Sequence, residues 1–185
     1  MGRVEDLAER FGRHLSVPIS ATGVAAERVL VVVYDKELER MLRARFDEFE
    51  IKATSAGRSF KRVDCTDLFA DWMASLDYRD AYFEEPEHLG AKIEGEFKKL
   101  VIEKLRTALK GTDARTVVAV TGTASLYGFV RLSEIIREID GDVRGCLAVF
   151  FPGTKDNNNY RLLDARDGWN YLAHCITLHS DGGHS

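Results

Sequence analysis

The sequence predicts an α/β fold, a three-layer Rossmann-like sandwich with a mostly parallel sheet of four to five strands. Apolar runs at 29–34, 116–121 and 145–151 alternate with amphipathic helical patterns, which is the order of parallel α/β proteins. These runs lack polar alternation and contain many β-branched residues, as expected for strands buried on both faces. A glycine turn after residues 116–121 then joins a strand to a helical pattern.

The composition predicts one globular domain. The chain has 185 residues, 45% of them hydrophobic and 30% charged, which is enough for a single core of useful size. We expect residues 1–185 to form one α/β domain. Within it, residues 1–27 are expected to be an N-terminal helix and linker, and residues 180–185 a frayed tail.

The amino-terminal half predicts alternating helices and strands. The expected helices cover 4–15, 38–46 and 68–76, and the expected strands cover 28–34 and 61–65. Pro18 ends the first helix because proline cannot continue it. Asp35 stands where the second helix begins, so its carboxylate is placed to cap exposed backbone N–H groups.

The middle of the chain predicts an excursion followed by a long helix. Residues 78–90 are acidic and aromatic, with Pro86 as a helix breaker, and are expected to link two elements without forming a second domain. In the helix that follows, Glu94 and Lys98 have the spacing of an ion pair on the solvent side. Gly111 is expected to end this helix.

The carboxyl-terminal half predicts two more strands of the central sheet. The expected elements are strands over 117–120 and 145–151, a helix over 126–139 between them, and short edge strands over 160–163 and 171–178. Pro152 and Gly153 are expected to end the strand before them, and the polar residues 154–159 favour a turn. Ligands of parallel α/β folds usually bind beyond the carboxyl ends of the strands.

The turn at Gly122 does not match known phosphate-binding loops. A Walker A loop needs a lysine after its second glycine, and residues 122–128 have the wrong spacing and no lysine. A dinucleotide fingerprint needs three glycines, and residues 121–124 contain one. Ser125 lacks the flanking glycines of a nucleophile elbow. We expect no catalytic residue and no cofactor here, and a helix-capping role for Thr123 or Ser125.

Two sets of potential metal ligands occur, and neither predicts a metal site. The first set is spaced poorly for a single ion and comprises His174, Cys175, His179 and His184. In the second set, Asp35 and Asp64 could converge at the carboxyl edge and hold a divalent ion, but carboxylates are also favoured at helix starts. Helix starts are the preferred explanation.

Arg131 is predicted to lie one and a half turns into the helix after the glycine turn. From there it could reach an anion above the strand ends, or hydrogen-bond to the loop at 156–159. The second, structural role is the preferred interpretation.

The charge balance argues against direct nucleic-acid binding. The formal net charge is -4, so the chain as a whole does not attract phosphate backbones. Arg58, Lys61 and Arg62 form the best local basic cluster, which is more typical of a solvated turn. No stretch approaches the roughly 18 to 20 apolar residues of a membrane helix. Three widely spaced cysteines and the lack of a signal-peptide core favour the reducing cytoplasm.

Four segments together form a recognisable pattern. They are TGTASLYGFVR at 121–131, AVFFPG at 148–153, YRL at 160–162 and NY at 170–171. This pattern resembles the BrxB family of BREX phage-defence systems. Relative to the family pattern, Ala124 replaces the second glycine of a Thr-Gly-x-Gly segment, and Gly128 replaces the proline of a Tyr-Pro pair. The front half of the chain matches more loosely, through residues 29–35 and 64–68.

The resemblance implies a small cytoplasmic accessory protein of bacterial antiphage defence. Such proteins are encoded with larger components that include an ATPase, a DNA methyltransferase and an alkaline-phosphatase-like protein. The resemblance brings no established catalytic residues. It marks the positions expected to shape a shared surface, which are Thr121, Gly122, Tyr127, Arg131, Pro152 and Gly153.

Two functions follow as hypotheses. The first is a noncatalytic adaptor that contacts other defence components through its strand-end loops and neighbouring helices. The second is a sensor or enzyme that binds a small phosphorylated ligand at the same strand ends. In that case Thr121, Thr123 and Arg131 would contact the anion, and Asp35 would hold a metal ion.

Overall fold

A parallel sheet forms the centre of the protein, as predicted. The computed structural model describes residues 2–20, 22–157, 159–162, 169–171 and 173–178. In this described part, five strands lie side by side in the order β2-β3-β4-β1-β7, and every neighbouring pair is parallel. Their bounds are Val29–Tyr34 for β1, Ser59–Asp64 for β2, Thr116–Thr121 for β3, Cys146–Asp156 for β4 and His174–Thr177 for β7. The predicted Rossmann-like α/β fold is confirmed.

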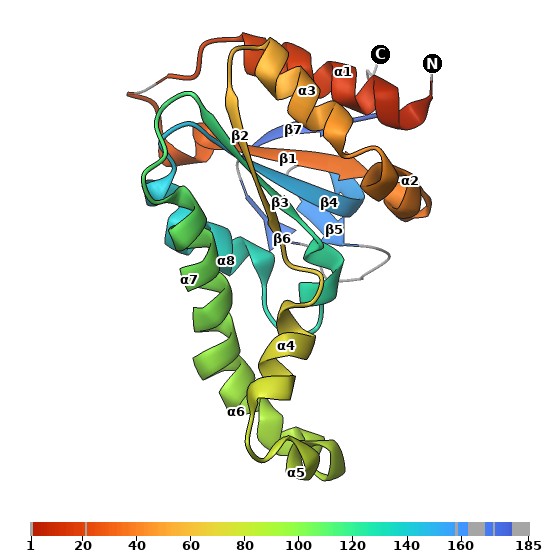
Figure 1. Ribbon diagram of the computed structural model, residues 1–185, viewed down its shortest axis with the longest axis vertical. Helices are drawn as coiled ribbons and strands as arrows, with labels where there is room; N and C mark the ends of the chain where they lie inside the picture. The colour runs from red at the N-terminus through yellow and green to blue at the C-terminus, as the bar shows by residue number, and fades with distance from the viewer. Residues whose placement is uncertain (1, 21, 158, 163–168, 172, 179–185) are drawn as a thin grey trace.

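Helices cover both faces of the sheet and complete three layers (Figure 1). One face carries α1 (Arg3–Ser16), α2 (Glu39–Ala44) and α3 (Asp47–Ser55), and the other carries α4 (Leu68–Ser75), α7 (Lys98–Leu109) and α8 (Leu132–Ile139). Short turns of 3-10 helix are η1 (Ala25–Arg28), η2 (Lys36–Leu38), η3 (Pro86–His88), η5 (Thr123–Leu126) and η6 (Asp140–Asp142). No helix among the described residues has the length and apolar character needed to cross a bilayer.

Successive residues of the central strands supply two separate hydrophobic cores. In β1, Val31 and Val33 belong to the core beneath α7 and α8, whereas Leu30 and Val32 belong to the core beneath α1 and α3. Neighbouring side chains of a strand point to opposite faces, so a strand covered on both sides must be apolar throughout. This is why the predicted runs lack polar alternation. Each fully buried side chain of this size contributes about 1.5 to 3 kcal/mol.

An aromatic cluster fixes α1 and α3 to the sheet. Phe49 of α3 meets Phe150 of β4 edge to face, with ring centroids 4.9 Å apart, and it also lies 5.5 Å from Phe11 of α1. Phe46, just before α3, packs on Phe150 at 4.9 Å. The Arg62 guanidinium of β2 covers the outer side of Phe46, 4.3 Å from the ring centroid. This cluster links α3 directly to the strands that end at the candidate site.

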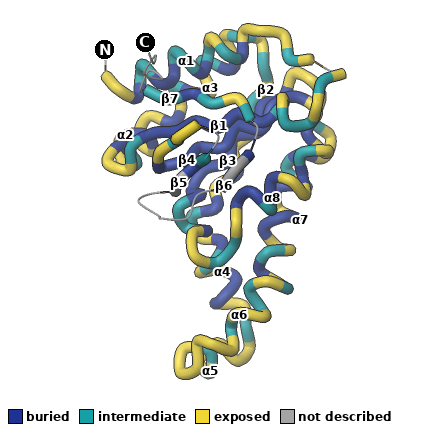
Figure 2. Tube along the Cα trace, turned by 180° about the vertical axis from the view of Figure 1, so that it is seen from behind, coloured by how far each residue is buried: buried dark blue, intermediate teal, exposed yellow. Residues whose placement is uncertain are grey.

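A helical arm extends from the body on the opposite face. It consists of α4, α5 (Arg79–Glu84), η3, α6 (Leu89–Lys92) and the π-helical turn η4 (Ile93–Phe97), which leads into α7. Its base is packed by aromatic rings: Phe69 stacks on Phe129 with centroids 3.7 Å apart, and Phe97 lies 5.2 Å from both Phe69 and Trp72. The far end lies away from the sheet (Figures 1 and 2). The excursion predicted at 78–90 forms the end of this arm.

Two predicted boundaries are wrong in an informative way. The helix expected from residue 126 begins only at Leu132, because Gly128 takes a left-handed conformation with φ of 82° that interrupts it. The strand expected to end at Pro152 continues to Asp156. Pro152 lies opposite Tyr34, where the parallel pairing with β1 ends, and Gly153 starts an antiparallel pairing with β5 (Asn159–Leu162). A proline without an N–H donor is tolerated at such a transition.

Several local predictions are confirmed. Glu94 and Lys98 form an ion pair at 3.7 Å, and Gly111 follows α7 with a positive φ of 74°. The short strands expected over 160–163 and 171–178 correspond to β5, which pairs with β4, and to β7 at the sheet edge, whereas β6 (Trp169–Asn170), which pairs with β5, was not expected. The tail at 180–185 lies outside the described residues, as do His179 and His184. The division of residues 1–27 into a helix and a linker stays a prediction.

Candidate functional site at the carboxyl edge

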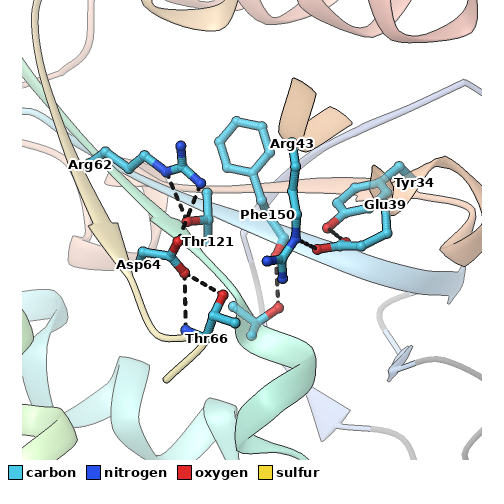
Figure 3. Close-up of polar contacts among 9 residues, drawn as sticks. Tyr34, Glu39, Arg43, Arg62, Asp64, Thr66, Thr121 and Phe150 are labelled. Atoms are coloured by element: carbon cyan, nitrogen blue, oxygen red, sulfur yellow. Dashed lines mark hydrogen bonds and ion pairs between the residues drawn. The ribbon is translucent and has the colours of Figure 1, made fainter. Parts of the chain in front are cut away.

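Polar side chains from β1, β2, β3, α2 and the turns after β2 and β3 gather at the carboxyl edge of the sheet (Figure 3). We call this set the carboxyl-edge cluster, and it comprises Tyr34, Glu39, Arg43, Arg62, Asp64, Thr66, Thr121 and Thr123. Its position follows from the topology, because all parallel strands end at the same edge. Ligands of parallel α/β folds usually bind at this edge.

Asp64 organises the part of the cluster that follows β2. One of its oxygens, Oδ1, accepts hydrogen bonds from the backbone N–H of Thr66 at 3.0 Å and from Thr66 Oγ1 at 2.5 Å. Arg62 reaches the other oxygen at 3.4 Å and donates from Nε to Thr121 Oγ1 at 3.1 Å. Burial alone would raise the pKa of Asp64, but the hydrogen bonds from Thr66 and the nearby arginines lower it overall. Asp64 is therefore a bound carboxylate and a poor proton acceptor.

Gly122 lies close to the turn formed by Asp64 and Thr66 after β2. It is left-handed, with φ of 71°, and a Cβ atom built on it would lie 2.5 Å from both Thr66 N and Thr66 Oγ1, and 2.6 Å from Asp64 Oδ1. No other residue type fits both the conformation and the space. The glycine that the sequence singled out thus serves the close packing of two strand-end turns.

Thr123 connects the same turn to the middle of the sheet. Its buried hydroxyl donates a 2.7 Å hydrogen bond to the carbonyl of Phe150 in β4. The predicted helix-capping role of Thr123 or Ser125 is wrong, because Gly122 precedes η5 and Arg131 precedes α8, neither with a side-chain capping bond. The hydroxyl proton of Thr123 is used to position the turn, so it is not free to be donated to a ligand.

Tyr34, Glu39 and Arg43 form the part of the cluster on the β1 side. Tyr34 donates its phenolic proton to Glu39 Oε2 at 2.5 Å, and Arg43 Nε donates to Glu39 Oε1 at 2.6 Å. Burial raises the pKa of Tyr34 well above its usual value, and the hydrogen bond to the Glu39 carboxylate raises it further. The phenol therefore stays protonated at neutral pH.

The two aspartates expected at strand ends do not converge. Asp35 forms an ion pair with Arg3 of α1 and makes no side-chain cap on η2. Asp64 is the last residue of β2, and both β3 and β4 lie between β2 and β1. Three strand spacings correspond to roughly 14 Å, too far for one ion. Within the described residues, no group of three or more His, Cys, Asp and Glu side chains could hold a metal ion.

The predicted site positions differ sharply in exposure. Tyr127 is 51% exposed, and the side chain of Arg131 is 83% exposed and 3.7 Å from Glu134. Asp35 is half-buried, and the buried positions are Thr121, Gly122, Thr123, Pro152 and Gly153. Arg131 precedes α8 and does not lie within a helix, so the predicted placement is corrected. Only the loop from Tyr127 to Arg131 presents predicted site residues openly to solvent.

The cysteines and the basic cluster have structural environments. Burial raises the pKa of the Cys65 and Cys146 thiols to about 12, which removes them as thiolate nucleophiles at neutral pH. Arg58 donates to the backbone carbonyls of Leu15, Ala114 and Val17, and Lys61 to that of Ala108. These cations therefore bind backbone carbonyls at the ends of neighbouring segments.

Sequence reasoning missed the links between the parts of the cluster. Glu39 and Arg43 have an i,i+4 spacing that could have been noticed. The contact of Arg62 with Thr121 depends on the pairing of β2 with β3, where Asp64 lies opposite Thr121. No local sequence signal reports that register.

The comparisons with known proteins agree with the pattern in the sequence. A family model described as BREX protein BrxB matches residues 65–174. The matched span includes the helical arm, β3, the Gly122 turn and β4. No curated protein matches the chain.

Proposed function

The chain belongs to the BREX protein BrxB family, and we propose that this component of a BREX defence system is a noncatalytic, cytoplasmic adaptor. In this proposal it acts by holding other components of the system together through protein–protein contacts. The strand-end loops and the helices next to them supply the contact surface.

The observation that carries the proposal is that the polar side chains of the carboxyl-edge cluster bind one another. Of the groups that could do chemistry, Asp64 is held by Arg62 and Thr66, and Glu39 by Tyr34 and Arg43. A general base needs a pKa near the working pH, whereas the pKa of Asp64 is lowered. This arrangement supports a scaffold role for the edge.

Three exposed residues of the same edge have the chemistry of a protein interface. Met41 of α2, Tyr127 and Arg131 are all exposed, and each follows the carboxyl end of a central strand. Methionine, tyrosine and arginine are enriched at protein interfaces relative to other surfaces. An aromatic and a guanidinium group in one short loop are the usual anchors of such contacts.

A pull-down from cells that express the whole BREX system tests the proposal. The tagged chain should recover at least one other component, and Tyr127→Ala and Arg131→Ala should reduce that recovery. Val24→Ala is the matched control, because Val24 is also exposed but precedes β1 at the opposite edge. Recovery of no component by the folded wild-type chain would refute the adaptor role.

A second candidate is a sensor or enzyme for a small phosphorylated ligand at the same edge. The observation that favours it is the exposed Arg131 guanidinium, since arginine binds phosphate bidentately. Nucleotides with Mg²⁺ or Mn²⁺ should then raise the melting temperature of the wild type and not of Arg131→Ala. No shift in the folded wild type would count against this candidate.

A further inference from the structure

The far end of the helical arm has a surface unlike that of the body. We call residues 77–88 the tip segment, which includes α5 and η3. All of its residues are exposed except Tyr82, which is partly buried against the core beneath the arm. In Figure 2 this end is almost entirely yellow and lies apart from the sheet. The tip segment therefore offers its side chains to solvent on several sides.

Two large aromatic side chains are exposed on this tip. Tyr78 is 77% exposed and Phe83 is 68% exposed, more than any other aromatic residue of the described chain. Tyr82, between them, is covered by the Lys92 ammonium at 6.0 Å from its ring centroid and anchors the tip to α6. The tip segment therefore exposes two large aromatic side chains near an anchored third ring. Exposed aromatic side chains of this size are common anchors of protein contacts.

The tip segment also has a net negative charge as large as that of the whole chain. It contains Asp77, Asp80, Glu84, Glu85 and Glu87. With Arg79 as its one lysine or arginine, its formal charge is -4, equal to the net charge of all 185 residues. The rest of the chain is therefore formally neutral. Charge of one sign at the end of an arm attracts a partner of the opposite sign.

Much of this charge is not neutralised within the molecule. Arg79 lies 3.8 Å from Asp80, and His88 lies 2.8 Å from Glu85. Across the described chain, Asp77, Glu84 and Glu87 form no ion pair with a lysine or arginine. Three such carboxylates on the same exposed segment as two aromatic rings would repel a nucleic acid and would suit a basic protein surface.

From these observations we infer that the tip segment docks on a basic, partly apolar surface of another protein component of the same BREX system. Phe83 and Tyr78 insert as apolar anchors, and the surrounding carboxylates pair with lysines or arginines of that component. This inference rests on the proposed adaptor function and names the chemistry of one partner. It also makes the arm a second contact region, separate from the carboxyl edge.

Site-specific cross-linking tests the contact in the complete system. The photoreactive residue p-benzoylphenylalanine replaces Phe83 in one strain and Val24 in a control strain, both with all other BREX components present. The cross-link at position 83 should capture one BREX component at a surface rich in lysine and arginine. Capture of nucleic acid or of a second copy of this chain would overturn the inference, as would the same product from position 24.

Affinity measurements with the captured component separate charge from shape. Glu84→Lys should weaken binding about tenfold, and added salt should weaken the wild type in the same direction. Glu50→Lys is the matched control, because Glu50 is exposed on α3 and its reversal changes the net charge equally. Phe83→Ala should also weaken binding about tenfold without lowering the melting temperature. Equal affinities for Glu84→Lys and Glu50→Lys would overturn the docking inference.

The two proposals fail in different ways. If BREX components are recovered at full affinity by all tip variants, the adaptor function stands and the docking inference is refuted. If the folded wild-type chain recovers no component at all, both are refuted.

Discussion

Gly122 lies so close to Thr66 that no side chain fits between them. A Cβ atom on Gly122 would be 2.5 Å from the Thr66 amide nitrogen, which is itself bound to the Asp64 carboxylate. The turns after β2 and β3 therefore interlock, and the shape of the carboxyl edge depends on a missing side chain.

Gly122→Ala should lower the free energy of unfolding by about 3 kcal/mol, because it adds a backbone clash to the cost of a left-handed alanine. Gly128→Ala is the control, since Gly128 has a similar φ of 82° and no atom within 4 Å of the position that a Cβ atom would take. It should cost only about 1 to 2 kcal/mol. Urea unfolding curves of both variants provide the comparison, and equal losses would contradict the interlocking of the turns.

The buried hydroxyl of Thr123 should stabilise the fold measurably. Thr123→Ala and Thr123→Ser both remove the methyl group, but the serine keeps the donor for the Phe150 carbonyl. The alanine variant should be less stable than the serine variant by about 1 kcal/mol. Denaturant midpoints at equal m-values measure the difference. Identical midpoints would show that the hydrogen bond adds nothing.

His14 should make the protein less stable in mild acid. Burial lowers the pKa of His14 below its ordinary value of 6.5, and the nearby His174 and Arg58 lower it further. The unfolded chain then binds this proton more readily than the folded one. The contribution of His14 to the free energy of unfolding is therefore fully present above pH 6.5, and it is lost as the pH falls through the pKa of His14 in the folded state.

Unfolding free energies between pH 5 and 8 measure this decline. His14→Gln should flatten the profile, and His174→Gln should reduce the decline partially, because the two rings lie 5.1 Å apart. An unchanged profile in His14→Gln would assign the pH dependence to other groups.

Cys65 and Cys146 should resist alkylation in the folded protein. Burial excludes the reagent and raises the pKa of both thiols to about 12, so little thiolate forms at pH 8. Peptide mapping after iodoacetamide treatment should find both unmodified, and both modified once urea is added. Cys175 is half-buried and serves as the internal comparison. Rapid modification of Cys146 in the native state would contradict its place in the core.

The strands of the core could be predicted from sequence because burial on both faces leaves a local signature. Residues 29–34 and 116–121 are buried at every position and are apolar except for the threonines at 116 and 121, and both became central strands. The family pattern was equally local, and its segments at 121–131 and 148–153 lie inside the matched span of 65–174.

The start of α8 could not be predicted, because the apolar pattern continues through the turn before it. Leu126 is buried within η5, and Phe129 stacks on Phe69 at the base of the arm. The apolar residues that make these tertiary contacts have the spacing of a helix face, so the sequence pattern predicts a helix that begins too early. The carboxyl-edge cluster was hidden for a similar reason, since Arg62 meets Thr121 only through the pairing of two strands far apart in sequence.

An adaptor holds two other components together, whereas a protein that only binds one component does not. One other BREX component is tagged and purified from cells with and without this chain, and its partners are quantified. The adaptor role predicts that a second component is retained only when this chain is present, and is lost again with Tyr127→Ala or Arg131→Ala. Equal retention of the second component in the absence of this chain would contradict the role.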